Sequence, residues 1–435
     1  MTITVAKTYA ARGGKDLALT AAEQREMLRS ALAQFASERG AVKKALLIPP
    51  DFTRYHSGAG ELTVAAFELL AAGHAQVDIL PALGTHRAMT GEELGRMFPG
   101  VPAERFFVHD WRREVEVIGE IPGAFFSAVS GGRVEYSAQV MLNKRLRHGG
   151  YDLILSVGQI VPHEVIGLAN QNKNIFIGVG GSDLINKSHF LGAAWGMERI
   201  MGRADTPVRQ VLNFAEREFA ADLPIVYALN VRSKDAAGGL QTRGLYIGLG
   251  DDGFQQAAKL SQQCNLDMLP APLKKIVVYL APEEFQSTWL GNKAVYRTRM
   301  VIADGGELVI LAPGLKHFGE DAQIDKLIRR FGYVTTPEIL RHVKENPELA
   351  ANLSAAAHLI HGSSEGRFTI TYCPGHLTRA EIESVNYRYA ELGGMLKRYD
   401  PKQLKDGVNR LADGEEIYFI SNPALGLWAL QSQFA

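Results

Sequence analysis

Residues 153–161 read LILSVGQIV, a continuous apolar run that ends directly before the polar group Pro162-His163-Glu164. A run without regular polar alternation is typical of a strand covered on both faces, as in a parallel sheet. Similar runs recur along the chain and alternate with longer stretches of helical periodicity. This alternation predicts an α/β fold of mostly parallel sheets flanked by helices, with strand ends free to carry a site.

The short runs rich in Val, Ile, Leu and Phe define the expected strands, and the longer amphipathic stretches define the expected helices. We predict strands at 45–48, 77–81, 106–109, 153–157, 175–179, 225–231, 245–248, 275–280, 308–311, 368–373 and 417–420. We predict helices at 21–39, 62–72, 208–219, 254–263, 321–330 and 379–392.

A chain of 435 residues exceeds the usual size of one hydrophobic core, so two domains are expected. Two prolines in NLDMLPAPL, residues 265–273, interrupt the pattern between a helix and a new strand. We therefore predict a first domain at 1–268, to which a C-terminal segment at about 406–435 returns, and a second α/β domain at 272–405.

The overall composition excludes several classes of protein. Lys plus Arg number 47, as do Asp plus Glu, so no net charge favours nucleic acid or an anionic membrane. Two cysteines cannot supply a disulfide framework or a four-cysteine zinc site. The N-terminus lacks the apolar core of a signal peptide, and no apolar run reaches membrane-spanning length. We expect a cytoplasmic enzyme or binding protein.

Two polar clusters follow the first predicted strands. Asp51, Thr53 and Arg54 come after LLIPP, and the guanidinium of Arg54 could bind a carboxylate or phosphate through two parallel hydrogen bonds. A helix start or a surface ion pair explains the same residues equally well. His86 follows VDILPAL, just before a Thr90–Glu93 capping box that predicts a helix from about Gly91. Its place at a strand end makes His86 a candidate for acid/base work.

The third cluster is the densest and follows LILSVGQIV. It contains His163, Lys173, Lys187 and His189 around a glycine turn. The spacing matches neither HExxH nor a cysteine-based zinc site, although His86, His163 and His189 could together hold a metal. The residues alone indicate an active site without naming its reaction.

Two other motifs are candidates for a functional site. GLGDDG at 248–253 fits the dinucleotide pattern G-x-G-x-x-G and lies between a strand and a helix, which supports a nicotinamide site. Against that site, Asp251 and Asp252 would repel a pyrophosphate, and no second strand with a terminal acid follows. His358 and His361 form an i, i+3 pair that is more often structural than metal-binding.

The clusters DFTR (51–54), GTHRAMT (84–90) and HEVIGLANQNKN (163–174) with KSHF (187–190) resemble the nickel-dependent lactate racemase family. In that family, a catalytic histidine lies ten residues before a cofactor-bearing lysine, and a nickel-binding histidine lies sixteen after it. His163, Lys173 and His189 keep both intervals. The resemblance covers about residues 45–190.

The resemblance implies an isomerase, a racemase or epimerase of 2-hydroxy acids, with its active site in the cleft between the two domains. Its cofactor would be a nickel-pincer nucleotide, a pyridinium-3-thioamide-5-thiocarboxylic acid mononucleotide nickel complex, covalently attached to Lys173 in the first domain. His189 would be the metal-binding residue, completing a square-planar nickel site. His86 and His163 would be the catalytic acid/base pair. Asp51, Thr53 and Arg54 would bind the cofactor, and Arg54 also the substrate.

This assignment is chemically reasonable. Removing the α-hydrogen of a hydroxy acid as a hydride avoids a carbanion beside a carboxylate. One histidine takes the hydroxyl proton, and two are needed because the hydroxyl points to opposite sides in the two isomers. Histidine has a pKa near 6.5, which suits both roles.

The C-terminal half departs from the family, which has a Tyr-Gln-x-x-Lys stretch here. The nearest match is residues 284–293, so we assign Gln286, Trp289 and Lys293 to substrate binding. Ala-Ala-Ala-His-Leu stands where the family has an aromatic residue near 355–360. The altered wall suggests a larger substrate than lactate, such as a sugar acid.

Two alternatives remain open. One is a nicotinamide-dependent oxidoreductase that uses GLGDDG, and the other is a non-catalytic binding protein of the same fold. The expected partners are a small hydroxy acid and the proteins that build the cofactor, with no nucleic acid or membrane.

Overall fold

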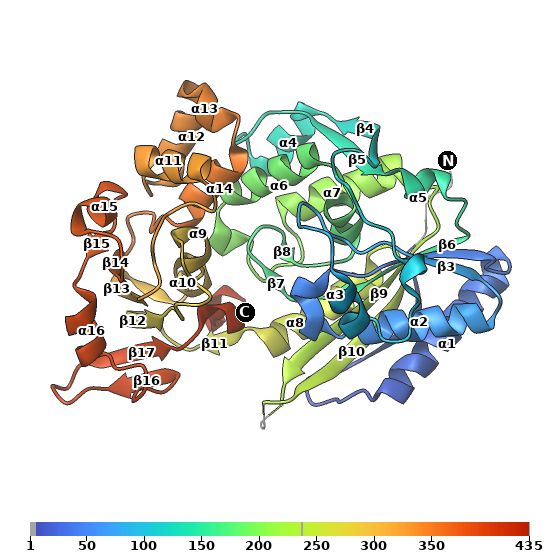
Figure 1. The fold of residues 1–435 in the computed structure, drawn as a ribbon, viewed down its shortest axis with the longest axis horizontal. Coiled ribbons are helices and arrows are strands. Elements are labelled where there is room, and N and C mark those ends of the chain that lie inside the picture. Colours follow the sequence, from blue (N-terminus) through green and yellow to red (C-terminus); the bar gives the residue numbers. More distant parts are fainter. Residues whose placement is uncertain (1–5, 236–237, 435) are drawn as a thin grey trace. The chain divides into compact units, whose positions relative to one another are not determined.

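The structure is a computed structural model that describes residues 6–235 and 238–434 (Figure 1). The chain forms two compact units. The first comprises Met1–Leu191 and Ile200–Asn265, and the second comprises Gly192–Arg199 and Leu266–Ala435. The predicted α/β class with parallel-rich sheets is confirmed, because each unit is built around one such sheet.

The sheet of the first unit has the order β1-β10-β9-β6-β2-β3. Its four strands from β9 to β3 are parallel, whereas β10 runs antiparallel to β9 and β1 antiparallel to β10. The strands are β1 (Lys7–Gly13), β2 (Lys44–Ile48), β3 (Gln76–Ile79), β6 (Leu153–Gln159), β9 (Ile225–Lys234) and β10 (Leu240–Leu249). Two short ribbons complete the unit: β4 (Val115–Ile121) with β5 (Ala138–Asn143), and β7 (Pro162–His163) with β8 (Gly167–Leu168).

Helices cover this sheet because their apolar stripes match its apolar faces. Leu28 and Phe35 of α1 and Leu62 of α2 pack with Leu47 and Leu155 of the strands in one buried cluster. Helix α8 packs against β9 and β10. The helices are α1 (Ala21–Arg39), α2 (Ala59–Ala72), α3 (Gly91–Met97), α4 (Gly123–Ser130), α5 (Lys144–His148), α6 (Ser182–Trp195), α7 (Pro207–Phe219) and α8 (Asp252–Asn265). Short turns are η1 (Phe52–Ser57), η2 (Ala103–Arg105), η3 (Asn174–Gly178) and η4 (Met197–Arg199).

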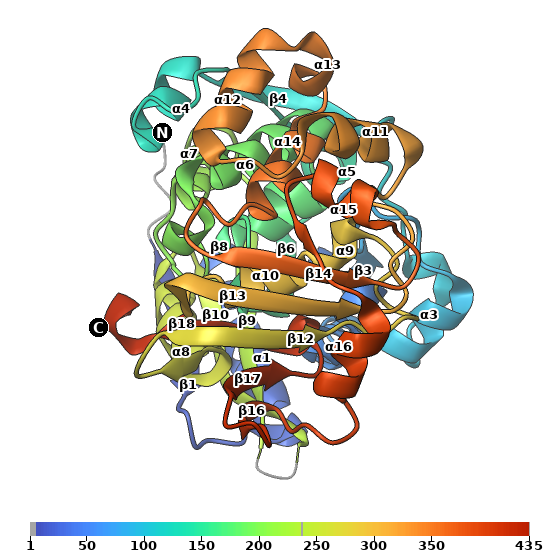
Figure 2. The ribbon, with the colours of Figure 1, turned by 90° about the vertical axis from the view of Figure 1, so that its left-hand side faces the viewer.

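The sheet of the second unit has the order β15-β14-β13-β12-β17-β16, and Figure 2 looks onto its central strands. All neighbours are parallel except β16 and β17. The strands are β12 (Leu273–Tyr279), β13 (Ile302–Ala312), β14 (Thr369–Pro374), β15 (Arg388–Tyr389), β16 (Gly407–Arg410) and β17 (Glu416–Ile420), with a separate pair β11 (Asp267–Leu269) and β18 (Trp428–Leu430). The helices are α9 (Thr288–Gly291), α10 (Lys293–Thr298), α11 (Ala322–Phe331), α12 (Thr336–Glu345), α13 (Pro347–Ala350), α14 (Leu353–His361), α15 (Arg379–Ser384) and α16 (Leu392–Arg398), with turns η5 (Pro423–Leu425) and η6 (Gln431–Gln433).

The segment 406–435 differs from its prediction, because it belongs to the second unit and does not return to the first. Strand β17 pairs in parallel with β12, with Val277 opposite Phe419. Ile417 and Phe419 are buried in the core of that unit. The central strand β12 would otherwise expose an unpaired edge, and β17 satisfies its hydrogen bonds.

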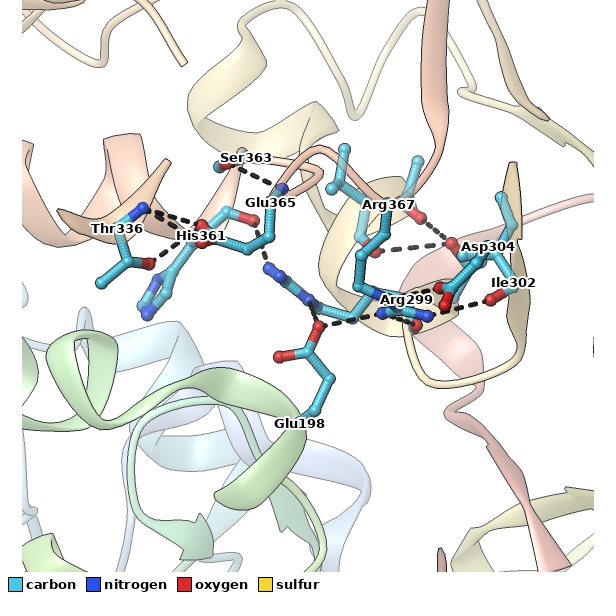
Figure 3. A network of polar contacts seen from close by, with 12 residues as sticks. Glu198, Arg299, Ile302, Asp304, Thr336, His361, Ser363, Glu365 and Arg367 are labelled. Carbon is cyan, nitrogen blue, oxygen red and sulfur yellow. Dashed lines mark hydrogen bonds and ion pairs between the residues drawn. The ribbon is translucent and has the colours of Figure 1, made fainter. Parts of the chain in front are cut away.

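The segment 192–199 is the other departure from a simple division at 265–272. It continues from α6 and contributes Glu198 to the second unit, where the carboxylate lies between Arg299 and Arg367 (Figure 3). Arg299 donates to it over 2.6 Å and is 2% exposed, so this ion pair is largely shielded from water. Arg367 also donates to Asp304, on β13.

Three predicted elements are wrong. Residues 175–179 form part of the π-helix η3 and not a strand, because the amide of Asn174 already bonds the carbonyl groups of Ile48 and Val157 at the ends of β2 and β6. Residues 106–109 make only one bridge, Ile79 to Phe106, before the chain turns away. Residues 379–392 break after α15, where Asn386 adopts a φ of 68°. Within the described residues, no helix has the length and apolar character needed to cross a bilayer.

Candidate functional site

The first candidate cluster lies where β2 ends and η1 begins. Asp51 is the N-cap of η1, is 5% exposed, and accepts hydrogen bonds from the backbone N–H and the hydroxyl of Thr53, at 3.1 and 2.5 Å. Arg54 follows on the same turn and is exposed. Asp51 therefore caps η1, while the exposed Arg54 beside it at the same strand end is accessible to a ligand.

Asp51 also orients His86, the key residue of the second cluster. Oδ2 of Asp51 lies 2.6 Å from Nδ1 of His86, whose side chain is 56% exposed. A buried carboxylate accepts this bond, so Nδ1 carries the proton and Nε2 keeps its lone pair. Burial raises the pKa of Asp51, but hydrogen bonds from His86 and Thr53 and the charges of His86 and Arg54 outweigh it and lower the pKa below its usual value.

The loop that carries His86 is held at both ends. Gly84, with a φ of 56°, donates its N–H to the carbonyl of Gly178 over 2.8 Å. Beyond His86, the predicted Thr90–Glu93 capping box is confirmed and starts α3 at Gly91. The imidazole is therefore presented between two fixed points.

His163 is held in the opposite tautomer. It lies on β7, and the backbone N–H of Val165 donates to its Nδ1 over 3.1 Å. Since Nδ1 accepts, the proton of the neutral ring is on Nε2. Desolvation lowers the pKa of His163 well below its usual value, and the charges of Lys173, His189 and Arg54 act in the same direction against Glu164.

Lys173 directly precedes η3 and is partly exposed. Desolvation by the surrounding protein lowers its pKa to about 8, helped by Arg54 and Arg209 and opposed by Glu164 and Asp51. Roughly a tenth of its amine is therefore uncharged at pH 7, far more than for an ordinary lysine, and the uncharged form is the nucleophile.

His189 lies on α6 and donates from Nδ1 to the carbonyl of Ile185 over 2.6 Å. Its Nε2 therefore keeps a lone pair, as in histidines whose other nitrogen is fixed while they bind a metal. Desolvation, and then the charge of Lys173, lower the pKa of His189 and keep the ring neutral.

The first unit thus brings together the site residues predicted for it. Electrostatic interactions connect Lys173 to Arg54 and Asp51, and connect His163 to Lys173 and His189. His86 joins through its hydrogen bond to Asp51. Groups far apart in sequence meet because β2, β3 and β6 are parallel neighbours and end at the same edge.

The three residues assigned to the C-terminal half lie in the second unit. The carbonyl and side-chain oxygens of Gln286 both accept from Lys316. Trp289 packs against His358 with ring centres 4.6 Å apart and ring planes 31° from parallel, and the ammonium of Lys293 lies 5.7 Å from the ring centre of Phe285. All three residues lie within residues 286–293, a segment that follows β12 and ends at the first residue of α10.

His358 is a structural residue, as the i, i+3 pattern suggested. Its Nε2 lies 2.9 Å from the hydroxyl of Tyr333, and burial lowers its pKa to about 3. In the part of the chain that the structure describes, no three His, Cys, Asp or Glu side chains form a metal-binding group.

Local structure explains why Gly248 and Gly250 of GLGDDG are glycines. Gly248 lies on β10, where an added Cβ would come within 2.2 Å of the carbonyl oxygen of Lys7 on β1. Gly250 has a φ of 71° in the turn before α8. Because β10 is antiparallel to both of its neighbours, the motif lacks the parallel βαβ surroundings of a dinucleotide fingerprint.

Sequence reasoning missed the groups behind the lysine. Arg209 is 1% exposed, and its guanidinium contacts the loop before Lys173. Asn172 and Asn174 flank the lysine and are both buried. The only signal was the triplet Asn-Lys-Asn, which suggested polar surroundings without identifying their partners.

Comparison with known proteins points to one family. Residues 16–199 match the family described as lactate racemase N-terminal domain. A lactate racemase from Thermoanaerobacterium thermosaccharolyticum is 34% identical over 119 residues, 26% of this chain and 24% of that relative. The chain thus matches about a quarter of that relative's length.

Two solved structures share the fold over nearly the whole chain. A protein from Thermotoga maritima has a TM-score of 0.75 at 24% identity, covering 97% of this chain and 100% of its own. The lactate racemase apoprotein from T. thermosaccharolyticum has a TM-score of 0.67 at 17% identity, covering 93% and 92%. At these identities the likeness establishes the fold.

Proposed function

We propose that this chain inverts C2 of a 2-hydroxy acid, because its residues 16–199 match the family described as lactate racemase N-terminal domain. The enzyme is then an isomerase, a racemase for a lactate-like substrate or an epimerase for a sugar acid. The observation that carries this proposal is the arrangement around Lys173, whose charge acts on His163 and His189, two rings that are oriented by hydrogen bonds to the backbone of Val165 and Ile185.

The same arrangement fits a nickel-pincer nucleotide tethered to Lys173. An uncharged amine is the form that can be acylated, so the lowered pKa suits covalent attachment. His189 offers the lone pair of Nε2 to nickel, since its Nδ1 proton is bound to the carbonyl of Ile185. When bound, the cofactor would supply a reversible acceptor for the substrate hydride.

The chain's own residues handle the proton of the substrate hydroxyl. His86 accepts it at Nε2, and Asp51 stabilises the imidazolium that results. His163 presents Nε2–H to the substrate oxygen, because the N–H of Val165 occupies its Nδ1, and it is the acid that returns a proton to that oxygen when the opposite isomer forms. Arg54 is exposed beside both and is suited to bind the substrate carboxylate or the cofactor, with Thr53.

In the second unit, we assign Gln286, Trp289 and Lys293 to the substrate. A lysine ammonium, an amide and an indole are suited to a carboxylate, a hydroxyl and a carbon chain respectively. This set favours a larger, hydroxylated acid over lactate.

Maturation would require the proteins that build the cofactor, so the decisive test uses protein made in a host that contains them. The intact mass should show an adduct, a peptide containing Lys173 should carry it, and nickel should be stoichiometric. Lys173→Ala should lose adduct and nickel together. Lys187→Ala is the matched control, because Lys187 lies nearby on α6 in an ion pair with Asp183 and should keep both. An unmodified Lys173 in matured, active protein would refute the proposal.

A further inference from the structure

The loop before Lys173 has an unusual backbone. Two consecutive non-glycine residues, Asn170 and Gln171, adopt left-handed φ values of 65° and 57°. Each such residue costs about 1 kcal/mol or more, so the pair persists only where surrounding contacts fix it. Nδ2 of Asn170 makes one of those contacts by donating to the carbonyl of Gln159 at 3.0 Å, and one other side chain makes four more.

That side chain is Arg209, on the first turn of α7. Its Nη1 donates to the carbonyl of Asn170 at 3.3 Å, to Oε1 of Gln171 at 2.8 Å and to Oδ1 of Asn172 at 2.5 Å. Its Nη2 donates to the carbonyl of Leu168 at 2.7 Å. The guanidinium thus contacts almost every residue between β8 and Lys173, and it lies 4.3 Å from the ring centre of Phe254.

Asn172, immediately before the lysine, is held from both ends. Arg209 binds its oxygen, while its amide nitrogen donates to Asn213 at 2.7 Å and to Glu216 at 2.9 Å. The other carboxylate oxygen of Glu216 accepts from the hydroxyl of Tyr227 at 2.6 Å. Asn172 is 0% exposed, so this network is inside the protein.

Asn174, immediately after the lysine, is anchored elsewhere. Its amide nitrogen donates to the carbonyl of Ile48 at 2.9 Å and to that of Val157 at 3.3 Å. The two neighbours of Lys173 are therefore fixed to different parts of the unit, one to α7 and one to the strand ends. The backbone of Lys173 has little freedom to move between them.

We propose that Arg209 is a positioning residue that fixes the backbone of Leu168–Asn172 and thereby sets where the Lys173 amine is presented. The proposal rests on the proposed function for the use of that amine, but the geometry is a property of the chain alone. A buried cation and carboxylate are expensive, and apolar residues of similar volume often stabilise a fold equally well. The network is better explained by the geometry that it imposes than by stability.

Charge and geometry can be separated with two variants. Arg209→Met removes both, whereas Arg209→Lys keeps the charge but loses the planar fork that binds several oxygens at once. Asn172→Ala is a milder third variant, which leaves Arg209 in place. Arg243→Met is the matched control, since Arg243 also binds backbone carbonyl groups of this unit, those of Leu17 and Lys234.

The readout is trace acylation of the cofactor-free chain with acetic anhydride across pH, quantified for each lysine by peptide mass spectrometry. In the unmodified chain, the Lys173 profile should have its midpoint at about 8. In Arg209→Met and Arg209→Lys, the loop relaxes and the amine gains water, so the midpoint should rise by about one pH unit or more. Asn172→Ala should shift it in the same direction by less, and Arg243→Met should not shift it.

Three results would overturn the proposal: a wild-type midpoint in both Arg209 variants, a wild-type midpoint in Arg209→Lys alone, which would make charge sufficient, or an equal shift in Arg243→Met. Thermal melting of each variant accompanies the profile, and if both Arg209 variants are unfolded, the Asn172→Ala result decides. Because no cofactor is involved, failure of the proposed function would appear separately, as a missing adduct on matured wild-type protein.

Discussion

Nδ1 of His86 lies 2.6 Å from Oδ2 of Asp51, whereas Nδ1 of His163 accepts the N–H of Val165 at 3.1 Å. The two imidazoles are therefore held in opposite tautomers. His86 presents a lone pair from Nε2, and His163 presents a proton. Their contributions to catalysis should accordingly differ.

The first prediction concerns Asp51→Asn. The amide would donate to Nδ1 of His86 and move the ring proton to Nε2, which removes the base. Turnover should fall about 10²- to 10⁴-fold, with little change in KM. Asp78→Asn is the control, because Asp78 is also buried in this unit but bonds the hydroxyl of Tyr151. Steady-state kinetics on matured protein measures both, and equal losses would contradict the assignment.

The second prediction compares glutamine at the two histidine positions. Glutamine can donate a hydrogen bond but cannot transfer a proton, so His86→Gln and His163→Gln should each lose about 100-fold or more in kcat. A loss of only about tenfold in His163→Gln would show that this ring donates a hydrogen bond without transferring a proton.

The third prediction concerns pH and the free energy of unfolding. The pKa of Lys173 is about 8 in the folded chain and about 10.5 when unfolded, so the unfolded state binds more protons between these values. The free energy of unfolding therefore rises with pH between these two values. Above the unfolded pKa the buried amine is neutral in both states and costs nothing, and below the folded pKa the fold bears the full cost of a charged, buried amine.

Lys173→Met has no amine at this position and therefore avoids the cost of a buried charge. Against the cofactor-free wild type, the variant should be the more stable protein at pH 7, and its advantage should shrink as pH rises from about 8 to 10.5. Urea unfolding of both proteins at several pH values provides the measurement. A constant difference would mean that the lysine titrates alike in both states.

The fourth prediction concerns Glu198→Gln in the second unit. Arg299 is 2% exposed and would lose its carboxylate, whereas Arg367 would keep its ion pair with Asp304. Leaving a buried guanidinium without a counter-ion should cost about 2–4 kcal/mol of unfolding free energy. Glu348→Gln, which breaks the exposed pairs with Lys326 and Arg330, should leave the free energy of unfolding almost unchanged. Denaturant unfolding tests both, and equal effects would refute the role of burial.

The sequence predicted much of the first unit, because its parallel strands are continuous apolar runs and its polar clusters follow them. It failed at 175–179, since five consecutive apolar or glycine residues are buried equally well in a π-helix and in a strand. It failed at 406–435 because a five-residue strand can complete either sheet, and only tertiary contacts select one.

Arg209 could not be predicted for a different reason. Three of its partners are amide side chains or carbonyl groups of Asn170, Gln171 and Asn172, which carry no charge pattern. The left-handed backbone at Asn170 and Gln171 also lacks the glycine that usually indicates it. Such a site becomes visible only when the path of the backbone is known.

Residues 192–199 are synthesised well before residues 266–435, with which they form the second unit. During synthesis, Glu198 cannot form its ion pair until Arg299, 101 residues downstream, has been made. A fragment beginning at Leu266 would lack Glu198, so the buried Arg299 would lose this carboxylate while Arg367 would keep Asp304. Proteolytic dissection at that boundary should therefore yield a stable half only if a peptide spanning 192–199 is added back.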